Sequence, residues 1–169
     1  KIDLAINSIV GSAGLIPTIN TVSNSIDLAL SNKESLVLGG HIIMPLLDDS
    51  SSQIIPVDSE PSAIFQCLHG EPDNSLKKII LTGSGGPFLE RPLDSFDTIT
   101  KEEALNHPKW NMGNKISIDS ATMMNKGLEY VEALWLFGVN TDQLDIVIHP
   151  QSIIHSFVQF IDDSYKAQL

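Results

Sequence analysis

The sequence predicts an α/β fold, because strand and helix signals alternate through its first half. Short apolar segments are followed by segments with helical periodicity, and glycine or proline marks several of the junctions. Helices of this length between strands are typical of βα units and of a largely parallel sheet. The chain has 169 residues, 42% of them hydrophobic, which is enough for one ordinary domain or two small ones with a buried core.

The first half contains apolar segments of strand length and helical segments between them. The apolar segments are residues 26–31, 53–57 and 77–82, and the helical segments are residues 32–47 and 60–68. Gly39-Gly40 weakens the middle of the first helix and Pro45 weakens its end. Ser59 is the expected N-cap of the second helix, with Pro61 in its first turn.

The second half begins with a polar region and ends with strands. Residues 94–113 are mostly polar, and Thr100 with the acids after it predicts a short helix. Residues 107–113 are expected to form a loop that exposes aromatic and sulfur side chains. The strongest helix signal covers residues 122–137 and ends at Gly138. Two further strands are expected at residues 145–148 and 153–161.

The composition excludes several classes of protein. A net charge of −11 argues against nonspecific binding of nucleic acid or of an anionic membrane. No apolar run reaches the roughly 18 residues that cross a bilayer. Residues 1–4 lack the pattern of a signal peptide, so the chain is expected to begin within a fold. The single cysteine, Cys67, excludes an internal disulfide, and its apolar neighbours predict a buried structural thiol in a reducing compartment.

Two carboxylates, Asp58 and Glu60, follow the strand predicted at residues 53–57. Ligand sites in open α/β sheets collect at the carboxyl ends of the strands. Because the two residues are two positions apart across a turn, both carboxylates can converge on one hard cation. The alternative is a turn aspartate followed by a solvated glutamate in the first turn of a helix.

A second cluster lies in residues 119–129. On a helix, Asn125, Lys126 and Glu129 share one face and can hold a phosphate and a metal together. Ser120, expected near the helix start, adds a hydroxyl close to free N–H groups. The alternative is an exposed Lys–Glu pair, but the helix is apolar nearly all round, and charged residues are rarely buried without a use.

Two weaker signals concern a glycine-rich turn and a lysine. Residues 83–86, Gly-Ser-Gly-Gly, follow a strand, and such a turn is either structural or a phosphate cradle that includes Ser84. It has neither the P-loop nor the dinucleotide pattern. Lys33 stands between a strand and a helix, where it can touch a substrate hydroxyl or remain solvated.

The five histidines do not have the spacing of a zinc site. His149 and His155 are expected to be structural. His107 differs because it stands near Trp110 in the predicted loop.

Six stretches of the chain, taken in order, share the pattern of one family. They are residues 32–35, 56–60, 81–88, 107–113, 119–129 and 148–152. Their sequences and their order resemble the 1-deoxy-D-xylulose 5-phosphate reductoisomerase family over essentially the whole chain. Several long motifs in register make a chance match very improbable.

The resemblance implies roles for individual residues. The implied metal ligands are Asp58, Glu60 and Glu129. The implied substrate contacts are Lys33, Ser59, Glu60, Ser84, His107, Trp110, Ser120, Asn125, Lys126 and Glu129. The implied catalytic residues are Lys33, Asp58, Glu60, His107 and Glu129. Residues implied near the nicotinamide cofactor are Asn32, Lys33, Glu34 and Gly113. Trp110 and Met112 would belong to a mobile flap that closes over the substrate.

The resemblance also implies a fold and an activity. Residues 1–56 would be the C-terminal part of a Rossmann-like NADPH-binding domain, and residues 57–169 an α+β catalytic domain with a mixed sheet, incomplete at its C-terminus. The implied reaction rearranges and reduces 1-deoxy-D-xylulose 5-phosphate with NADPH and Mg²⁺ or Mn²⁺. The implied partners are a phosphorylated small molecule and a second copy of the chain, with no nucleic acid and no membrane. The implied location is a bacterial cytoplasm or a plastid-type organelle.

Two features depart from the family pattern. Pro61 stands where the family usually has a histidine. The glycine clusters at residues 11–14 and 83–86 lack the dinucleotide fingerprint, so the 169-residue chain is expected not to turn over NADPH by itself. Two alternatives remain: a metal-dependent sugar-phosphate isomerase or aldolase without redox function, and a non-catalytic fragment that binds metal and phosphate.

Overall fold

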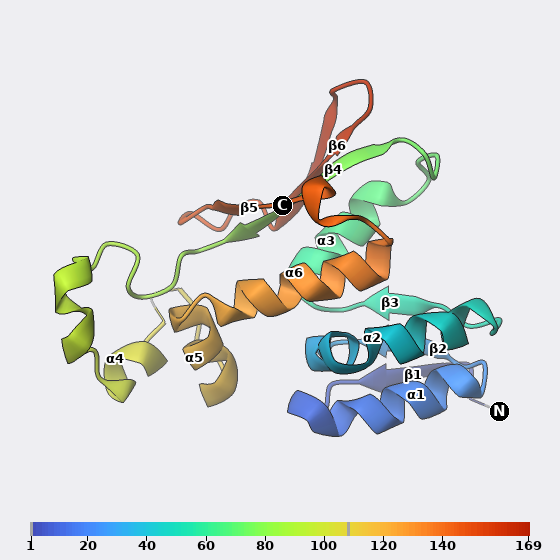
Figure 1. Cartoon of the computed structure of the whole chain (residues 1–169), viewed down its shortest axis with the longest axis horizontal. Coiled ribbons are helices and arrows are strands. Elements are labelled where there is room, and N and C mark those ends of the chain that lie inside the picture. Colours follow the sequence, from blue (N-terminus) through green and yellow to red (C-terminus); the bar gives the residue numbers. More distant parts are fainter. Residues whose placement is uncertain (1, 108) are drawn as a thin grey trace.

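Two β-sheets lie on either side of a long helix, α6 (Met124–Phe137), in a computed structural model of the chain (Figure 1). The structure describes residues 2–107 and 109–169. Lys1 and Pro108, which belong to segments discussed in the sequence analysis, are therefore outside the described residues.

The first sheet is parallel and has the strand order β1-β2-β3. Its strands are Leu4–Asn7, Asp27–Leu30 and Ile54–Pro56. The helices α1 (Leu15–Ser23) and α2 (Lys33–Asp48) connect the strands, so the predicted α/β alternation is confirmed. Asn32 is the N-cap of α2, and its side chain accepts the N–H of Ser35.

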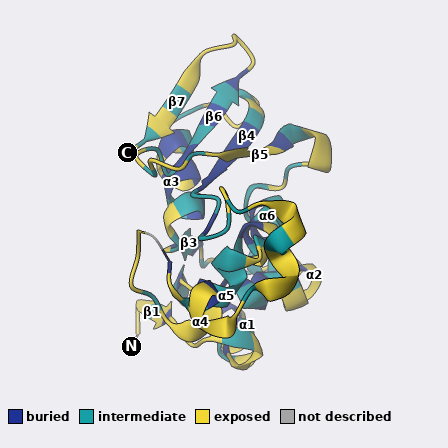
Figure 2. Cartoon of the chain, turned by 90° about the vertical axis from the view of Figure 1, so that its left-hand side faces the viewer, coloured by how far each residue is buried: buried dark blue, intermediate teal, exposed yellow. Residues whose placement is uncertain are grey.

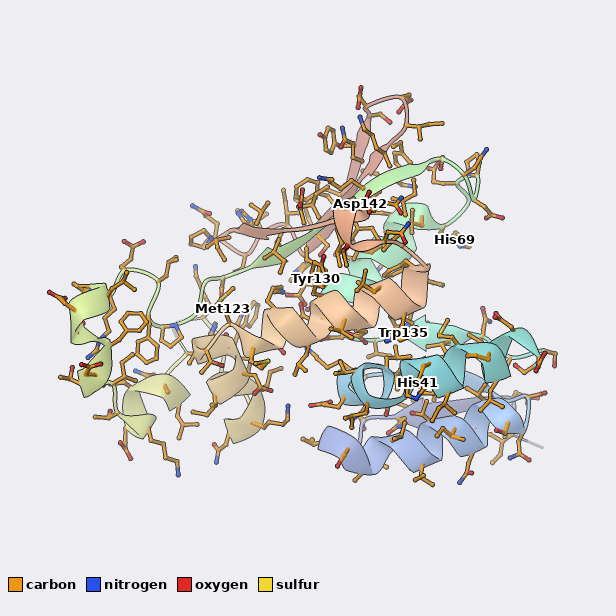
Figure 3. All side chains as sticks on the ribbon, viewed as in Figure 1. His41, His69, Met123, Tyr130, Trp135 and Asp142 are labelled. Atoms are coloured by element: carbon orange, nitrogen blue, oxygen red, sulfur yellow. The ribbon has the colours of Figure 1, made fainter. Side chains whose placement is uncertain are left out.

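The core of this sheet continues onto α6. Its buried side chains are Val22, Leu28, Leu30, Leu36, Ile43 and Ile54, and Trp135 and Leu136 of α6 pack against them. Gly40 permits this packing, because a Cβ there would lie 2.5 Å from the indole of Trp135 (Figure 3). The neighbouring Gly39 leaves helical geometry, with φ −130° and ψ 15°. The weak centre predicted for this helix is therefore the place where the indole lies against α2.

The second sheet is mixed and has the strand order β5-β4-β6-β7. Its strands are Leu76–Gly83 (β4), Leu144–Ile148 (β5), Ser156–Phe160 (β6) and Tyr165–Gln168 (β7). β4 pairs in parallel with β5 and antiparallel with β6, which confirms the mixed sheet. The helix α3 (Ser59–Leu68) packs against β6 and β7. β4 and β6 form the buried centre of this layer (Figure 2).

The core of the second sheet contains the single cysteine. Its buried members are Ile64, Cys67, Ile79, Leu81, Ala133, Leu144, Val158 and Phe160. Cys67 is 2% exposed and free, so the predicted buried thiol is confirmed. Ala133 comes from α6, and Leu134 and Phe137 of the same helix pack against this core.

Two helix starts differ from the sequence prediction. The helix predicted at residues 122–137 begins at Met124, because Met123 has a left-handed backbone, with φ 60°, that a continuous helix cannot contain. A separate helix, α5 (Asn114–Ala121), precedes it and was not predicted. Ser120 therefore lies near the end of α5, and its expected place at a helix start is wrong. The N-cap of α3 is Asp58 rather than Ser59.

The short elements follow local signals to different degrees. Thr100 and Glu103 form a capping box at the start of α4 (Lys101–Leu105), as predicted. Of the residues 153–161 that were predicted as one strand, only Ser156–Phe160 (β6) form a strand. The strands β1 and β7 were not predicted, because a strand of four residues has too little periodicity to be recognised. Short 3₁₀ helices occupy Gly11–Gly14, Leu93–Thr98 and Thr141–Gln143. Among the described residues, no helix has both the length and the apolar content that a membrane span requires.

Candidate metal and phosphate site

A cavity of about 370 Å³ gathers most of the predicted site residues. Ten of them line it: Asp58, Ser59, Glu60, Ser84, His107, Trp110, Ser120, Asn125, Lys126 and Glu129. They come from the start of α3, the end of β4, the loop after α4, and the helices α5 and α6. Met112 of the predicted flap also lines the cavity. The motifs, which are far apart in the sequence, therefore converge in one place.

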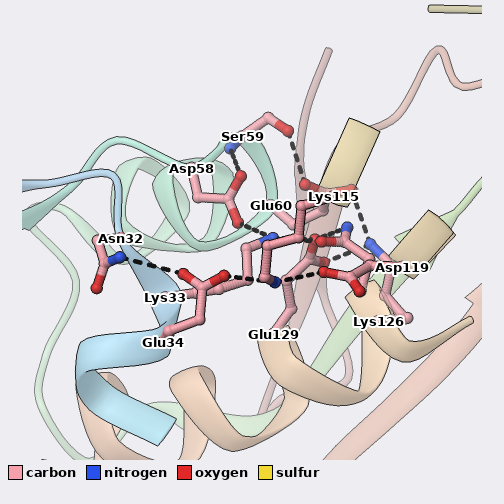
Figure 4. Close-up of polar contacts among 11 residues, drawn as sticks. Asn32, Lys33, Glu34, Asp58, Ser59, Glu60, Lys115, Asp119, Lys126 and Glu129 are labelled. Atoms are coloured by element: carbon pink, nitrogen blue, oxygen red, sulfur yellow. Dashed lines mark hydrogen bonds and ion pairs between the residues drawn. The ribbon is translucent and has the colours of Figure 1, made fainter. Parts of the chain in front are cut away.

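Three carboxylates meet at one side of the cavity. Asp58 caps α3, Glu60 lies in the first turn of the same helix, and Glu129 is fully buried on α6. One oxygen from each of the three lies within 4.8 Å of the others (Figure 4). This spacing is compatible with three oxygen ligands around one ion.

Two ammonium groups lie among these carboxylates. Lys33 Nζ lies 2.6 Å from Asp58 Oδ2, 3.0 Å from Glu129 Oε1 and 2.7 Å from Asn125 Oδ1. Lys126 Nζ lies 2.7 Å from Glu60 Oε1 and also contacts Glu129 Oε2. Asp58 Oδ2 makes an ion pair with Lys33 but no hydrogen bond among the described residues. Each carboxylate thus has a cation beside it.

Burial and charge shift the pKa values of this cluster. Burial, and then the neighbouring Glu60, raise the pKa of Glu129 to about 7, against the opposing effect of Lys126 and Lys33. Burial also raises the pKa of Glu60, but Lys126 outweighs burial and lowers it. Burial works against the charged form of Lys33, yet Glu129 and Asp58 raise its pKa overall. The lysines therefore stay charged at neutral pH, and Glu129 titrates near neutrality.

The donor set fits a hard divalent cation. Three carboxylates supply oxygen ligands, which Mg²⁺ and Mn²⁺ prefer, and no thiol or imidazole belongs to the cluster found among the described residues. The two ammonium groups show that positive charge is stable at this position. A cation bound there would compete with the lysines for the same oxygens.

Hydroxyl groups and a glycine turn also line the cavity. Gly85 and Gly86 have positive φ, and the Gly86 N–H donates to Ser84 Oγ. A Cβ on Gly86 would lie 2.7 Å from the carbonyl oxygen of Ser120, so only glycine lets the turn approach α5. This approach places the hydroxyl groups of Ser84 and Ser120 in one cavity with Lys126.

His107 connects this turn to the loop that carries Trp110. Its Nδ1 accepts the N–H groups of Lys109 at 3.2 Å and of Trp110 at 3.1 Å. Because Nδ1 accepts, the proton of the neutral ring is on Nε2, which lies 3.2 Å from Ser84 Oγ and donates to it. Burial lowers the pKa of His107, which favours this neutral form. Trp110 also lines the cavity, and 52% of it is exposed.

Family models of one enzyme match most of the chain. The model described as 1-deoxy-D-xylulose 5-phosphate reductoisomerase C-terminal domain matches residues 54–137, and the model described as 1-deoxy-D-xylulose 5-phosphate reductoisomerase matches residues 1–40. The chain belongs to the 1-deoxy-D-xylulose 5-phosphate reductoisomerase family. Family members from Clostridium beijerinckii and Chloroherpeton thalassium are each 56% identical to it over 167 residues. These matches cover 99% of the chain and 43% of each relative, so the chain spans less than half the length of the reductoisomerases it matches.

Solved reductoisomerase structures have the same fold. A crystal structure of DOX-P reductoisomerase in complex with NADPH, fosmidomycin and magnesium superposes with a TM-score of 0.92 at 42% identity. The Zymomonas mobilis reductoisomerase in complex with NADPH gives 0.90 at 44% identity. Each match covers 99% of this chain and 43% of the solved one. The similarity confirms the predicted fold class across the chain.

The residues predicted near the cofactor lie outside the cavity. Asn32 is buried, and its amide donates to the carbonyl of Gly11 at 2.9 Å. Glu34 pairs with Lys115 at 2.6 Å, and Gly113 is exposed at the start of α5. Lys33 alone of this group reaches the carboxylate cluster. Asn32, Glu34 and Gly113 are therefore neither among the residues that line the cavity nor in the cluster of three carboxylates.

Several residues to which the sequence analysis assigned no binding or catalytic role also line the cavity. They are Thr82, Ile116, Met123, Ser152, Ile154 and His155. His155 was interpreted as structural, yet it faces the cavity, whereas His149 accepts the N–H groups of Ile153 and Ile154 and is structural as expected. Thr82, Met123 and Ser152 lie within the motif stretches but carry no side-chain pattern that indicates binding, and Ile116, Ile154 and His155 lie outside the stretches.

Proposed function

We propose that the chain forms the catalytic centre of an NADPH-dependent 1-deoxy-D-xylulose 5-phosphate reductoisomerase. The reaction converts 1-deoxy-D-xylulose 5-phosphate to 2-C-methyl-D-erythritol 4-phosphate in the non-mevalonate pathway of isoprenoid synthesis. The observation that carries this proposal is one cavity that is lined by three convergent carboxylates, by Lys126 in contact with two of them, and by the hydroxyl groups of Ser84 and Ser120. Relatives crystallised with NADPH and with magnesium support a redox reaction over the isomerase or aldolase alternative.

The proposed domain organisation follows the two sheets. Residues 1–56, which contain the first sheet, are assigned to the C-terminal part of an NADPH-binding domain. Residues 57–169, which contain the second sheet and the cavity, are assigned to the catalytic domain. Asn32, Lys33, Glu34 and Gly113 are assigned to the surroundings of the cofactor. NADPH supplies the hydride when it is bound.

The metal is assigned to Asp58, Glu60 and Glu129. A Mg²⁺ or Mn²⁺ ion there would act as a Lewis acid and as a template for the substrate oxygens. Asp58 and Glu60 are fixed by the start of α3, and Glu129 by a buried helix face, so the protein presents the three ligands with little freedom. Preorganised ligands lower the cost of binding an ion in the correct geometry.

The substrate is assigned to the rest of the cavity. Lys126 and Asn125, with the hydroxyls of Ser84 and Ser120, would hold the phosphate and a substrate hydroxyl, while Lys33 and Ser59 would contact the carbon chain. A phosphate held away from the reacting carbons supplies binding energy that serves closure and orientation. His107 would touch the substrate from the glycine-turn side.

The loop at the mouth is assigned to closure. Trp110 is half exposed, and its backbone is already tied to His107, so a short movement would bring the indole over the substrate. Closure would exclude water from the reacting groups. We further propose a homodimer in the bacterial cytoplasm or a plastid-type organelle, as the family resemblance implies.

Two measurements test this function separately. Electron paramagnetic resonance of Mn²⁺ added to the 169-residue chain should show binding that weakens about tenfold or more in Glu129→Gln. Glu71→Gln, which removes a carboxylate paired with Lys166 on the far end of the second sheet, should not change it. Equal Mn²⁺ binding in wild type and Glu129→Gln contradicts the metal assignment.

The redox part is tested with the complete gene product. Loss of NADPH absorbance should require both 1-deoxy-D-xylulose 5-phosphate and Mg²⁺. Conversion of the sugar phosphate without NADPH consumption would instead support the isomerase or aldolase alternative.

A further inference from the structure

Glu132 is a buried carboxyl group that the assignments above do not use. It is 0% exposed on α6, and both of its carboxyl oxygens lack a hydrogen-bond partner among the described residues. Burying a polar group without a partner costs free energy. A buried carboxyl group without a partner is explained if it gains a hydrogen-bond or ion-pair partner in another conformation or liganded form of the protein.

The position of Glu132 relates it to the carboxylate cluster. It lies three residues after Glu129, so the two side chains are neighbours on one face of α6. After burial, the charges that act on it most strongly are those of Asp58 and Lys33. Burial and Asp58 raise the pKa of Glu132 well above its ordinary value, which favours the neutral acid, whereas Lys33 acts in the opposite direction.

Lys33 is the cation whose partners would change on metal binding. Its ammonium contacts Asp58 and Glu129, which are two of the three proposed metal ligands, and Asn125. A divalent cation on these oxygens would take both anionic partners and repel the ammonium. The Lys33 side chain is only 8% exposed, so the displaced charge is held inside the protein rather than in water. It then needs another buried anion.

We propose that Glu132 is a positioning residue that accepts the Lys33 ammonium when a divalent cation binds to Asp58, Glu60 and Glu129. The proposal rests on the metal assignment above. With all three carboxylates ionised, as a bound dication requires, the carboxylates and the two ammonium groups have a net charge of one negative unit, and the dication would turn this into one positive unit. An ionised Glu132 restores neutrality, and its proton passes to solvent. The carboxyl group of Glu132 thus replaces the two carboxylates that Lys33 gives up to the metal.

A double-mutant cycle with Mn²⁺ as the probe tests this coupling. Mn²⁺ affinity is measured by electron paramagnetic resonance for the 169-residue chain, Glu132→Gln, Lys33→Met and the double variant. Glu132→Gln should weaken Mn²⁺ binding by about tenfold, because Lys33 then keeps competing for the ligands. In the Lys33→Met background the same change should alter the affinity less than about twofold. Glu71→Gln is the control.

The outcomes separate the proposal from its alternatives. An equal loss with and without Lys33 would mean that Glu132 binds the metal or acts on it directly, and would overturn the proposal. No loss in Glu132→Gln would mean a purely structural role and would also overturn it. If wild type does not bind Mn²⁺, the metal assignment itself fails. If wild type binds and only the coupling is absent, the metal assignment stands.

A second measurement does not depend on the folding of variants. In a crystal structure of the wild-type chain with Mg²⁺, Lys33 Nζ should lie within hydrogen-bonding distance of a Glu132 carboxyl oxygen. Lys33 still on Asp58 and Glu129 beside the ion, with Glu132 unpaired, would overturn the proposal.

Discussion

The ammonium of Lys126 lies 2.7 Å from Glu60 Oε1, although 66 positions separate the two residues in the sequence. The contact joins the first turn of α3 to the first turn of α6. It leaves the lysine at the boundary between the carboxylates and the hydroxyl groups of the cavity. Under the proposed metal assignment, Lys126 would turn from the carboxylates to the substrate phosphate when the ion binds.

Removal of Lys126 should weaken substrate binding. In the complete gene product, Lys126→Ala is expected to raise the KM for the phosphorylated substrate about tenfold or more, because a charge-assisted hydrogen bond contributes about 1.5–3 kcal/mol. The KM is measured from steady-state rates of NADPH oxidation. Lys77→Ala, which removes an exposed lysine paired with Asp163, is the control. A KM equal to that of the control would show that Lys126 does not contact the substrate.

The stability of the metal-free chain should depend on pH through Glu129. Its pKa is about 7 in the folded chain and lies above the ordinary value of 4.5. The folded state thus holds a proton that the unfolded state has lost, so this contribution is complete at low pH and is lost as pH rises toward 7. Urea unfolding at pH 5 and pH 7.5 should show a larger loss of stability in wild type than in Glu129→Gln. Parallel losses would contradict the raised pKa.

His107 should hold the backbone of the loop that carries Trp110. His107→Phe keeps a ring but removes Nδ1, so the amides of Lys109 and Trp110 lose their acceptor. Hydrogen exchange at these two amides should become faster, while exchange at Ala133 in the buried core should not change. Unchanged exchange at Lys109 and Trp110 would rule out the anchoring role.

The same loop should respond to ligands. Exchange across residues 109–113 is expected to slow when Mg²⁺ and a substrate analogue bind together, because closure buries these amides. Identical exchange in the free and bound protein would leave Trp110 as an ordinary surface residue.

Two glycine substitutions should have opposite effects on stability. Gly40→Ala places a Cβ 2.5 Å from the indole of Trp135 and should cost about 1–3 kcal/mol by overpacking. Gly127→Ala, on the exposed side of α6, meets only Met124 Sδ at 3.9 Å and should stabilise by about 0.5–1 kcal/mol. Thermal unfolding measures both. A Gly40→Ala chain as stable as wild type would show that α2 and α6 do not pack closely.

The sequence predicts the long elements and the membership of the site better than it predicts local geometry. Strands such as β4 and the helices α2 and α6 have enough residues for their periodicity to stand out. The break at Met123 does not stand out, because a methionine carries no local signal for a positive φ. The prediction that Ser120 lies near a helix start was wrong for this reason.

The convergence of the motifs could be inferred from the family resemblance but not from spacing alone. Asp58 and Glu60 are close in sequence, and a strand end predicts their convergence. Glu129 joins them only through the packing of α3 on α6, which no local pattern shows. The same limit applies to Glu132, whose lack of a partner is visible only in three dimensions.

The helix α6 belongs to both hydrophobic cores, since Trp135 packs into the first and Ala133 into the second. The two halves of the chain should therefore unfold together, in one cooperative transition, rather than as independent units. Glu129 lies on the same helix, four residues before Ala133 and six before Trp135. Any hinge motion between the sheets would change its distance from Asp58, so a bound ion would stabilise one particular angle between the two halves.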